Sequence, residues 1–312
     1  MRILVTGGAG FIGSHLVDGF LREGHSVEVI DNLSSGNRDN LPTGVPLNQM
    51  DIQSDECGKV FERFRPEVLC HHAAQLDVFK SMADPMFDAN VNIVASLRLF
   101  EQCRKHGTQR ILFASSAAIY GAQTAYPAPE THPDRPVSPY GVAKLTVEHY
   151  LRFYQLQYGL QPTCLRYANV YGPRQSTVGE AGVVAIFAKL LRSGKAPTIF
   201  GNGEQTRDFV YVGDIVAANL AALNTKLIGT YNVSTGMETT VNDLYALMAQ
   251  SFGSSLKAVH GPERAGEMPR SSLDSSKLAQ ESSWRPQTRL ADGVQRTCDF
   301  FKAAGSSQAT SG

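Results

Sequence analysis

Residues 2–31 read RILVTGGAGFIGSHLVDGFLREGHSVEVID, and this stretch decides the fold. It opens with a short apolar run, Arg2–Thr6, whose length suits a buried strand. A segment of helical length, Phe11–Glu23, comes next, and a second apolar run, Ser26–Ile30, completes the unit. A strand, a glycine-rich loop, a helix and a second strand within about 30 residues predict the first βαβ unit of a dinucleotide-binding domain.

The loop between the first strand and the helix is rich in glycine. Gly8, Gly10 and Gly13 fit the pattern G-x-G-x-x-G, and Gly7, Gly10 and Gly13 fit G-x-x-G-x-x-G equally well. Backbone N–H groups at the positive end of a helix can bind a pyrophosphate, provided that no side chain stands between them and the ligand. The residues that we expect to contact the cofactor here are Gly7, Gly10, Phe11, Ile12 and Gly13.

Asp31 directly follows the second apolar run, so it is predicted at the carboxyl end of the second strand. A carboxylate at that position accepts hydrogen bonds from the adenosine ribose and repels a 2′-phosphate. The sequence therefore favours NAD over NADP as the cofactor. Arg38 lies seven residues further on in a polar loop and is the one side chain nearby that could approach a 2′-phosphate. We interpret it as a solvated loop cation.

Short apolar runs and segments of helical length alternate along the rest of the first half of the chain. The runs are Glu67–Cys70, Arg110–Ala114 and Pro162–Arg166, and the helical segments are Asp55–Arg65, Pro85–His106 and Ser138–Tyr158. Such alternation with few hairpin signals predicts right-handed crossovers and a parallel sheet covered on both faces. The predicted fold class is α/β, a Rossmann-type doubly wound sheet.

The alternation of short apolar runs and helical segments ends after about residue 167. The loops lengthen there, and irregular stretches separate helical segments such as Thr240–Phe252 and Leu290–Phe300. We expect a smaller C-terminal α/β lobe there, made of residues 170–208 and 235–303. The dinucleotide-binding domain would then comprise residues 1–169 and 209–234. Within the latter, Phe209–Leu223 predicts one more strand and helix that return to the sheet. The small polar residues 304–312 predict a flexible tail.

The composition is that of a soluble globular protein, with 42% apolar and 19% charged residues. Acidic and basic residues balance at 29 each, so no net charge attracts nucleic acid or an anionic membrane. No apolar run is long enough for a membrane span, and no signal segment precedes the first strand. The five widely spaced cysteines favour free thiols over disulfides or a metal site. We expect a cytoplasmic protein that binds neither nucleic acid nor membranes.

The stretch SPYGVAKL, residues 138–145, places Tyr140 four residues before Lys144 at the start of a predicted helix. Side chains at this spacing share one face of a helix. A free phenol has a pKa near 10, and a fixed positive charge close to it favours the ionised form. Tyr140 could therefore exchange a proton with a substrate hydroxyl or carbonyl group beside the cofactor.

The motifs, taken in order, resemble those of the extended short-chain dehydrogenase/reductase family, and within it the nucleotide-sugar epimerases such as UDP-glucose 4-epimerases. The resemblance covers nearly the whole chain and rests on TGGAGFIGSH, DNLSSG, HHAAQLDV, SSAAIYG, SPYGVAK, LRYANVYGPRQ, FGNGEQTRDFVYV and ERAGEMPRSSLD. It implies NAD-dependent epimerisation at C4 of a UDP-hexose through a 4-keto intermediate. The sugar would be the glucose/galactose pair or its N-acetylated counterpart.

The resemblance also assigns roles to individual residues. Ser116 would join Tyr140 and Lys144 as the third catalytic group, binding the sugar oxygen together with Tyr140. The two positions after Ser116 distinguish the relatives, because nucleotide-sugar dehydratases carry Asp-Glu there. This chain has Ala117 and Ala118, which cannot move protons, so dehydration is disfavoured.

Further cofactor and substrate contacts are implied by the same resemblance. The additional NAD-binding positions would be Asn32, Ser34, Ser35, Gly36, Asp51 and Ile52 on the adenosine side and Ala73, Ala74 and Gln75 on the nicotinamide side. The UDP-sugar would meet Ser116, Tyr140, Asn169, Arg207, Arg264 and Ser271. Some epimerases have a bulky tyrosine at the position of Ser271, so serine would leave room for an N-acetyl group. We interpret His71 and His72, at a strand end, as structural histidines.

A homodimer is expected, because the family pairs two helices of each subunit and both candidate helices, Pro85–His106 and Ser138–Tyr158, carry apolar residues on more than one face. Three alternatives to the epimerase remain open at this point. They are a nucleotide-sugar 4-ketoreductase, a UDP-glucuronate 4-epimerase and a non-catalytic NAD-binding regulator.

Overall fold

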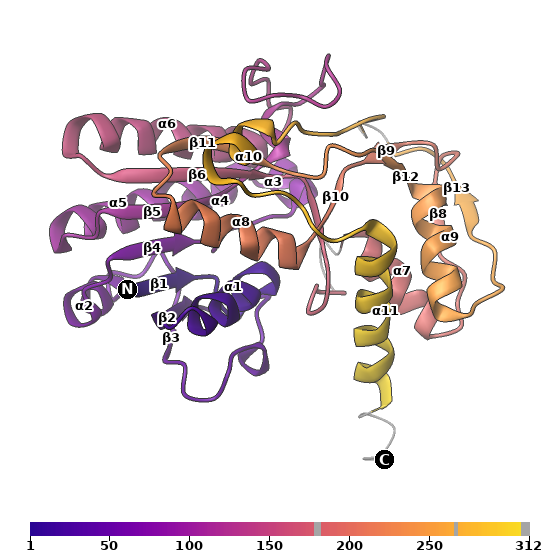
Figure 1. Ribbon diagram of the computed structural model, residues 1–312, viewed down its shortest axis with the longest axis horizontal. Helices are drawn as coiled ribbons and strands as arrows, with labels where there is room; N and C mark the ends of the chain where they lie inside the picture. The colour runs from indigo at the N-terminus through magenta and orange to yellow at the C-terminus, as the bar shows by residue number, and fades with distance from the viewer. Residues whose placement is uncertain (178–181, 265–267, 307–312) are drawn as a thin grey trace.

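The computed structural model describes residues 1–177, 182–264 and 268–306, and Figure 1 shows a large lobe built on a sheet with a smaller lobe beside it. The sheet of the large lobe has seven parallel strands in the order β11-β6-β5-β4-β1-β2-β3. The strands are β1 (Arg2–Thr6), β2 (Ser26–Asp31), β3 (Leu47–Gln49), β4 (Val68–His71), β5 (Arg110–Ser116), β6 (Gln161–Tyr167) and β11 (Gly229–Val233). The Rossmann-type doubly wound sheet predicted from the sequence is confirmed.

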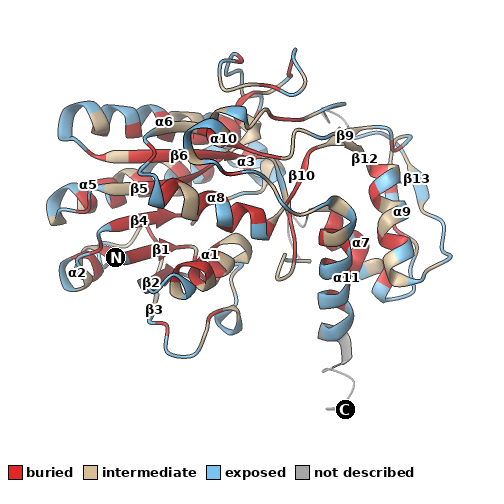
Figure 2. Cartoon of the chain, viewed as in Figure 1, coloured by how far each residue is buried: buried red, intermediate tan, exposed pale blue. Residues whose placement is uncertain are grey.

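Two layers of helices cover the sheet, and alternate residues of each strand point into one layer or the other. Ile3 and Val5 of β1 pack with α1 (Phe11–Arg22) and α8 (Val212–Asn224), while Leu4 lies in the opposite core. That second core is closed by α2 (Cys57–Phe64), α5 (Ala95–His106) and α6 (Pro139–Tyr158). Figure 2 shows the strands as an almost continuous buried layer between these helices. Burial on both faces explains why the strand sequences are apolar throughout.

The helical segment expected over Pro85–His106 is one continuous path with a local change of pitch. It consists of α4 (Pro85–Ala89), a single π-helical turn η2 (Asn90–Val94) and α5. A short helix, α3 (Val78–Ala83), precedes it and packs with α4 against α6. π-Helical turns inside α-helices are frequent at functional sites, and the turn here contains the buried Asn92.

One expectation about the sheet was wrong in detail. The strand within Phe209–Leu223 is β10 (Phe209–Tyr211), which pairs with β7 (Asn169–Tyr171) in a separate two-stranded sheet. The strand that returns to the large sheet is β11, which pairs with β6 after the helix α8. Its sequence, Gly229–Val233, begins with glycine and is only partly apolar. The hydrophobic pattern therefore did not predict a strand at these residues.

The smaller lobe has its own apolar core. Its helices are α7 (Val183–Arg192), α9 (Val241–Phe252) and α11 (Leu290–Ser306), and residues from all three form one cluster. Two pairs of short strands complete it, β8 (Thr198–Phe200) with β13 (Val259–Gly261), and β9 (Thr206–Arg207) with β12 (Thr239–Thr240). The Thr240 hydroxyl caps α9 by accepting a hydrogen bond from the Asp243 N–H group. The exact boundaries of the two domains stay a prediction.

The remaining elements are η1 (Arg38–Asn40), η3 (Ala117–Ile119) and α10 (Ser276–Ser282). The helix α11 includes residues 304–306, which we expected in a flexible tail, and residues 307–312 lie outside the described ranges. Within the described parts of the chain, none of the helices combines the length and the hydropathy needed to cross a lipid bilayer.

The long connection between η3 and α6 packs against the segment around Ser272 and Leu273. Ala128, in this connection, forms an isolated parallel bridge with Leu273, and each residue lies in the same small buried cluster as Ile119 and Tyr120. The Gln123 amide oxygen accepts a hydrogen bond from the Ser272 N–H group at 3.1 Å. The segment that follows Ser116 is therefore fixed against the segment that contains Ser271.

Candidate active site

The glycine loop follows β1 and leads directly into α1. Gly7 has φ of +69°, and a Cβ atom there would stand 2.7 Å from the backbone nitrogen of Ala73. A Cβ atom at Gly13 would stand 2.1 Å from the carbonyl oxygen of Gly7. Both positions therefore require glycine, the first for its backbone conformation and both for space. The loop is held against the strand end that carries Ala73.

The first turn of α1 has no side-chain cap, because Gly10 occupies the N-cap position. Helix N-termini leave N–H groups without partners within the helix, and those of Phe11 and Ile12 belong to this first turn. A side-chain-free cradle and an uncapped helix end are what a pyrophosphate needs. The residues present therefore fit the predicted NAD.

Asp31, at the end of β2, is buried beside the glycine loop. Its Oδ2 accepts a hydrogen bond from the Ala9 N–H group at 2.9 Å, and its Oδ1 accepts one from the Leu33 N–H group at 2.8 Å. Gly36 lies close to both Ala9 and this carboxylate. The carboxylate thus fixes the two loops that flank the predicted ribose position, while each oxygen retains a further lone pair.

The other residues predicted on the adenosine side lie at the ends of β2 and β3. The Asn32 amide donates to Asp51 Oδ2 at 2.8 Å, and the Ser34 N–H group donates to Asn32 Oδ1 at 3.0 Å. Ser35 is exposed, and Ile52 is buried. Arg38 donates to the carbonyl oxygen of Val45 in its own loop, in agreement with its interpretation as a loop cation.

Ala73, Ala74 and Gln75 follow β4, which is the neighbour of β1 at the point where the strand order reverses. Ligands of open parallel sheets bind at this point. The side-chain amide of Asn92, in the π-helical turn, binds both backbone groups of Gln75. Its oxygen accepts from the Gln75 N–H group at 2.9 Å, and its nitrogen donates to the Gln75 carbonyl oxygen at 2.8 Å. The Gln75 and Asn92 amides both donate to Oδ1 of Asp88 at 2.9 Å.

The predicted catalytic residues come from β5 and from the first turns of α6. Ser116 ends β5, and its Oγ accepts a hydrogen bond from the Ala118 N–H group at 3.1 Å. Gly141, next to Tyr140, packs against the carbonyl oxygen of Ala118, so the Ser116 turn and the start of α6 are in contact. The Tyr140 N–H group donates to Ser81 Oγ at 3.3 Å, which fixes this end of α6 to α3.

Lys144 extends beneath Tyr140 and is only 4% exposed. Its Nζ donates to the carbonyl oxygen of Ala114 at 2.8 Å and lies 5.7 Å from the centroid of the Tyr140 ring. Burial lowers the pKa of Lys144 from its usual value to about 8, and the carboxylates of Asp88 and Glu148 act in the opposite direction. The structure therefore brings the ammonium group and the phenol together on one face of α6, as the sequence spacing predicted.

His71 and His72 are buried and hydrogen-bonded, in agreement with a structural role. His71 lies between the hydroxyl groups of Thr6 and Ser96, and His72 Nε2 lies 3.1 Å from the Tyr167 hydroxyl. Burial lowers the pKa of each imidazole to about 3, and the charge of Lys144 adds to the effect. Both rings are therefore neutral at physiological pH.

The residues predicted to bind the substrate come from several segments of the chain. Asn169 begins β7, and its N–H group donates to the carbonyl oxygen of Asp208, the residue after Arg207. Arg207 lies in β9, and Arg264 stacks on the Phe200 ring at 3.9 Å. Residues 265–267, which follow Arg264, lie outside the described residues.

Ser271 lies next to an arrangement that the sequence did not reveal. Arg270 binds Glu238 through two hydrogen bonds of 2.9 Å and 2.6 Å and stacks on the Tyr126 ring at 4.1 Å. Glu238 also accepts a hydrogen bond from Thr206, the neighbour of Arg207. Arg270 is the main reason why the pKa of Glu238 falls to about 2. One ion pair, Arg270–Glu238, thus connects three parts of the proposed site. Thr206 next to Arg207 binds Glu238, Ser271 directly follows Arg270, and Tyr126 in the segment after Ser116 stacks on Arg270.

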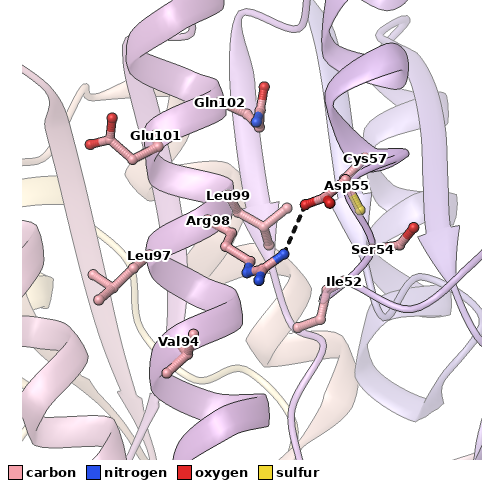
Figure 3. A pocket seen from close by; sticks show the side chains of 10 residues that line it. All are labelled: Ile52, Ser54, Asp55, Cys57, Val94, Leu97, Arg98, Leu99, Glu101 and Gln102. Atoms are coloured by element: carbon pink, nitrogen blue, oxygen red, sulfur yellow. Dashed lines mark hydrogen bonds and ion pairs between the residues drawn. The ribbon is translucent and has the colours of Figure 1, made fainter.

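A cavity of about 310 Å³ lies between α5 and the loop after β3 (Figure 3). Arg98 points across it and donates to Asp55 at 2.9 Å, and Ile52 is the one predicted site residue on its wall. The catalytic residues lie elsewhere, so this cavity is not the reaction site.

A sequence profile of the NAD dependent epimerase/dehydratase family matches residues 3–234. The chain belongs to this family. The resemblance expected from the motifs is thereby confirmed, and so is NAD as the cofactor.

Three relatives are similar over nearly the whole chain. UDP-glucose 4-epimerase of Mycolicibacterium smegmatis is 42% identical over 310 residues, which cover 97% of this chain and 99% of the relative. The structure of UDP-glucose 4-epimerase from Thermotoga maritima with UDP-glucose has a TM-score of 0.94 at 44% identity, covering 97% of this chain and 99% of that one. The Thermus thermophilus UDP-glucose 4-epimerase complex with NAD has a TM-score of 0.93 at 44% identity, covering 97% and 100%. The predicted class of enzyme agrees with all three.

Proposed function

We propose that this protein is an NAD-dependent epimerase that inverts C4 of a UDP-hexose, with UDP-glucose and UDP-galactose as its first candidates. The observation that carries the proposal is the assembly of Ser116, Tyr140 and Lys144 at the end of β5, one strand away from the switch point of the sheet. A tyrosine supported by a buried ammonium group can take a proton from a sugar hydroxyl and return it. The family membership and the similar epimerases agree with this chemistry.

The glycine loop and the uncapped start of α1 would hold the pyrophosphate of NAD, Asp31 the adenosine ribose, and the residues from Ala73 to Gln75 the nicotinamide side. When bound there, NAD would supply the acceptor, and then the donor, of the hydride at C4 of the sugar. Lys144 supplies a fixed positive charge beneath Tyr140, which favours the phenolate. Ser116, whose Oγ has accepted only the Ala118 N–H group, remains able to donate its own proton to the sugar oxygen.

Inversion requires the 4-keto sugar to present its other face before hydride returns. The protein must therefore hold the substrate through groups remote from C4 and bind the sugar ring loosely. Arginine suits the diphosphate because its planar fork can bind two oxygens, and Arg207 and Arg264 are our candidates. Asn169 is a further candidate for binding this part of the UDP-sugar. Ser271 would face the C2 substituent of the sugar.

Two other reactions use the same set of residues. A 4-ketoreductase would need Ser116, Tyr140 and Lys144 but would stop after one hydride transfer, and a UDP-glucuronate 4-epimerase would differ only in the sugar. Dehydration is disfavoured, because Ala117 and Ala118 form the turn η3 directly after Ser116 and neither can act as acid or base. A non-catalytic NAD-binding protein would have no need for Lys144 to be buried beneath Tyr140.

We also propose that the protein forms a homodimer through α4–α5 and α6. Both helices expose large apolar side chains, which suggests a partner surface. These are Met86, Phe87 and Val94 on the first helical path and Val142, Tyr150, Phe153 and Leu156 on α6. A second copy can cover both sets at once around a twofold axis. The five buried, unpaired thiols suit a cytoplasmic location.

Proton NMR with a panel of UDP-hexoses and catalytic NAD tests the function. We expect the anomeric signal of the C4 epimer to grow to equilibrium with no net change in NADH absorbance. Tyr140→Phe should abolish this while the variant remains folded. Conversion that requires stoichiometric NADH and a 4-keto sugar would identify a reductase. No conversion of any sugar under either condition would contradict catalysis on UDP-hexoses.

Light scattering after size-exclusion chromatography tests the proposed homodimer. The variant Phe153→Glu, on the surface of α6, should yield monomers.

A further inference from the structure

Asp88 is a buried carboxylate on α4 that the mechanism above does not use. It is 1% exposed, and its Oδ1 accepts hydrogen bonds from the Gln75 and Asn92 amides. Its Oδ2 is buried and has no hydrogen-bond partner among the residues that the structure describes. Its two hydrogen-bond partners are neutral amides, and none of the ion pairs among the described residues includes Asp88. A buried carboxylate without a bonded cation is costly, and such a group calls for an explanation.

Lys144 is the cation whose charge acts on Asp88. The helix α4 packs against α6, and each of the two groups appears among the charges that shift the pKa of the other. Burial raises the pKa of Asp88, whereas the Gln75 and Asn92 amides and the charge of Lys144 lower it. Asp88 is also the strongest of the charges that hold the pKa of Lys144 up against burial.

The other groups around Lys144 cannot replace Asp88. Glu148, one turn further along α6, already binds Arg166 in a buried ion pair of 2.6 Å and accepts from Ser115, so its charge is compensated. On the sheet side, Lys144 Nζ lies 4.8 Å from the centroid of the Phe113 ring, and its charge also acts on His71 and His72, which are neutral. Tyr140, on the same helix, is a further titratable group beside Lys144, with its ring centroid 5.7 Å from Nζ. Among the negative charges that act on the ammonium group, the one not compensated by a bonded cation therefore comes from α4.

We propose that Asp88 is a positioning residue of the catalytic centre, which holds the Gln75 side chain with one carboxylate oxygen and keeps Lys144 protonated through its charge. This inference rests on the proposed function for its effect on turnover, but the interaction between the two charges does not. An uncharged Lys144 could not support a phenolate at Tyr140. Asp88 thereby extends the pH range over which Tyr140 can act, and it links the nicotinamide side of the site to the proton-transfer side.

Asp88→Asn removes the charge and keeps an oxygen that can accept from Gln75 and Asn92. The matched control is Asp84→Asn, which removes one charge from the exposed N-cap of the same helix and leaves an equally good cap. The first readout is NMR titration of lysine side chains labelled with ¹³C at Cε in the NAD-loaded protein, with Lys144 assigned through Lys144→Arg. We expect Asp88→Asn to lower the titration midpoint of Lys144 by about one pH unit and Asp84→Asn to leave it unchanged.

The second readout is the pH dependence of kcat. In Asp88→Asn, the decline of kcat at alkaline pH (the alkaline limb of the profile) should move to lower pH by about one unit, as the lysine midpoint does. The profile of Asp84→Asn should match that of the wild type. A loss of thermal stability with an unchanged lysine midpoint and an unchanged limb would make Asp88 merely structural and overturn the proposal. The lysine titration does not need turnover. A shifted midpoint in a protein inactive on every UDP-hexose would contradict the proposed function and leave this inference standing.

A reciprocal measurement covers the case in which Asp88→Asn does not fold. Coupling between two charges must be equal when measured from either end. Lys144→Met should therefore raise the titration midpoint of the Asp88 carboxyl carbon, followed by ¹³C NMR, by about the same one unit. An Asp88 midpoint that stays at its wild-type value in Lys144→Met would refute the coupling.

Discussion

The backbone at Gly141 lies so close to the carbonyl oxygen of Ala118 that a Cβ atom on Gly141 would stand 2.7 Å from it. Gly141 is in the first turn of α6 beside Tyr140, and Ala118 is in η3 after Ser116. A backbone-to-backbone contact of this kind leaves no flexible side chain that could move aside. The distance between the hydroxyl groups of Ser116 and Tyr140 is therefore controlled by the absence of one methyl group.

Gly141→Ala should reduce kcat by on the order of 100-fold while changing KM much less, because a displacement of about 1 Å between catalytic groups has effects of this size. Steady-state kinetics with the favoured UDP-hexose measures it. Gly159→Ala, at the other end of α6, is the control. Gly159 has φ of +70° and open space around it, so this variant should lose about 1 kcal/mol of stability and retain its kcat. Equal loss of kcat in both variants would contradict the role of the Ala118 contact.

Asp31→Asn should weaken NAD binding by about tenfold or more, because a hydrogen bond to a charged group contributes about 1.5–3 kcal/mol. Both carboxylate oxygens of Asp31 accept backbone N–H groups, and an amide can offer only one oxygen. The variant should also discriminate less against NADP. Calorimetric titration of the NAD-free protein with both cofactors checks this, with the exposed Asp39→Asn as the control. An unchanged ratio of the two affinities would show that Asp31 does not select the cofactor.

The buried histidines predict a loss of stability in acid. In the unfolded chain each imidazole titrates near 6.5, whereas in the folded protein the pKa of His71 and of His72 is about 3. The unfolded state therefore binds more protons below pH 6.5, and each histidine should cost about 1.4 kcal/mol of unfolding free energy per pH unit. Urea unfolding at pH 7.5, 6.5 and 5.5 measures the slope. His72→Gln should be less stable at pH 7.5 yet lose stability less steeply towards pH 5.5, and parallel slopes would argue against this cause.

Ser271→Tyr should reduce kcat/KM for an N-acetylated UDP-hexose far more than for UDP-glucose. The backbone around Ser271 is held in place, because Arg270 is bound to Glu238 and the Ser272 N–H group is bound to Gln123. A phenol ring at this position would therefore extend into the proposed sugar site and not push the segment aside. Competition assays with the two sugars in one reaction give the ratio directly. Ser276→Tyr, in the first turn of α10, serves as the control. If the N-acetylated activity is untouched, Ser271 does not face C2.

Arg270→Met should raise KM for the UDP-hexose by about tenfold and change kcat less. It removes the ion pair with Glu238 that connects Thr206, and through it the Arg207 strand, to the segment around Ser271. Breaking one partner of such a pair leaves Glu238 without its cation. Arg285→Met, outside this network, is the matched control. A normal KM in Arg270→Met would show that the ion pair does not position the substrate residues.

The local part of the site was predictable from the sequence. Gly7, Gly10, Gly13 and Asp31 follow one another within a single βαβ unit, so their mutual placement depends on the geometry of one strand, one turn and one helix. Tyr140 and Lys144 share a helical face by spacing alone. The structure agrees with both arrangements, because short-range geometry leaves few alternatives.

Tertiary packing decided the rest. The charges of Asp88 and Lys144 act on each other only because α4 packs on α6, and no periodicity in either helix reveals which face meets the other. Arg270 meets Tyr126 because the segment after Ser116 crosses to the smaller lobe. The seventh strand, β11, is identified by its pairing with β6 and not by its own weak sequence. The sequence by itself determined the fold class and which residues carry the chemistry; the charges and contacts that tune them depend on residues far apart in the chain, which only close packing of the folded elements brings together.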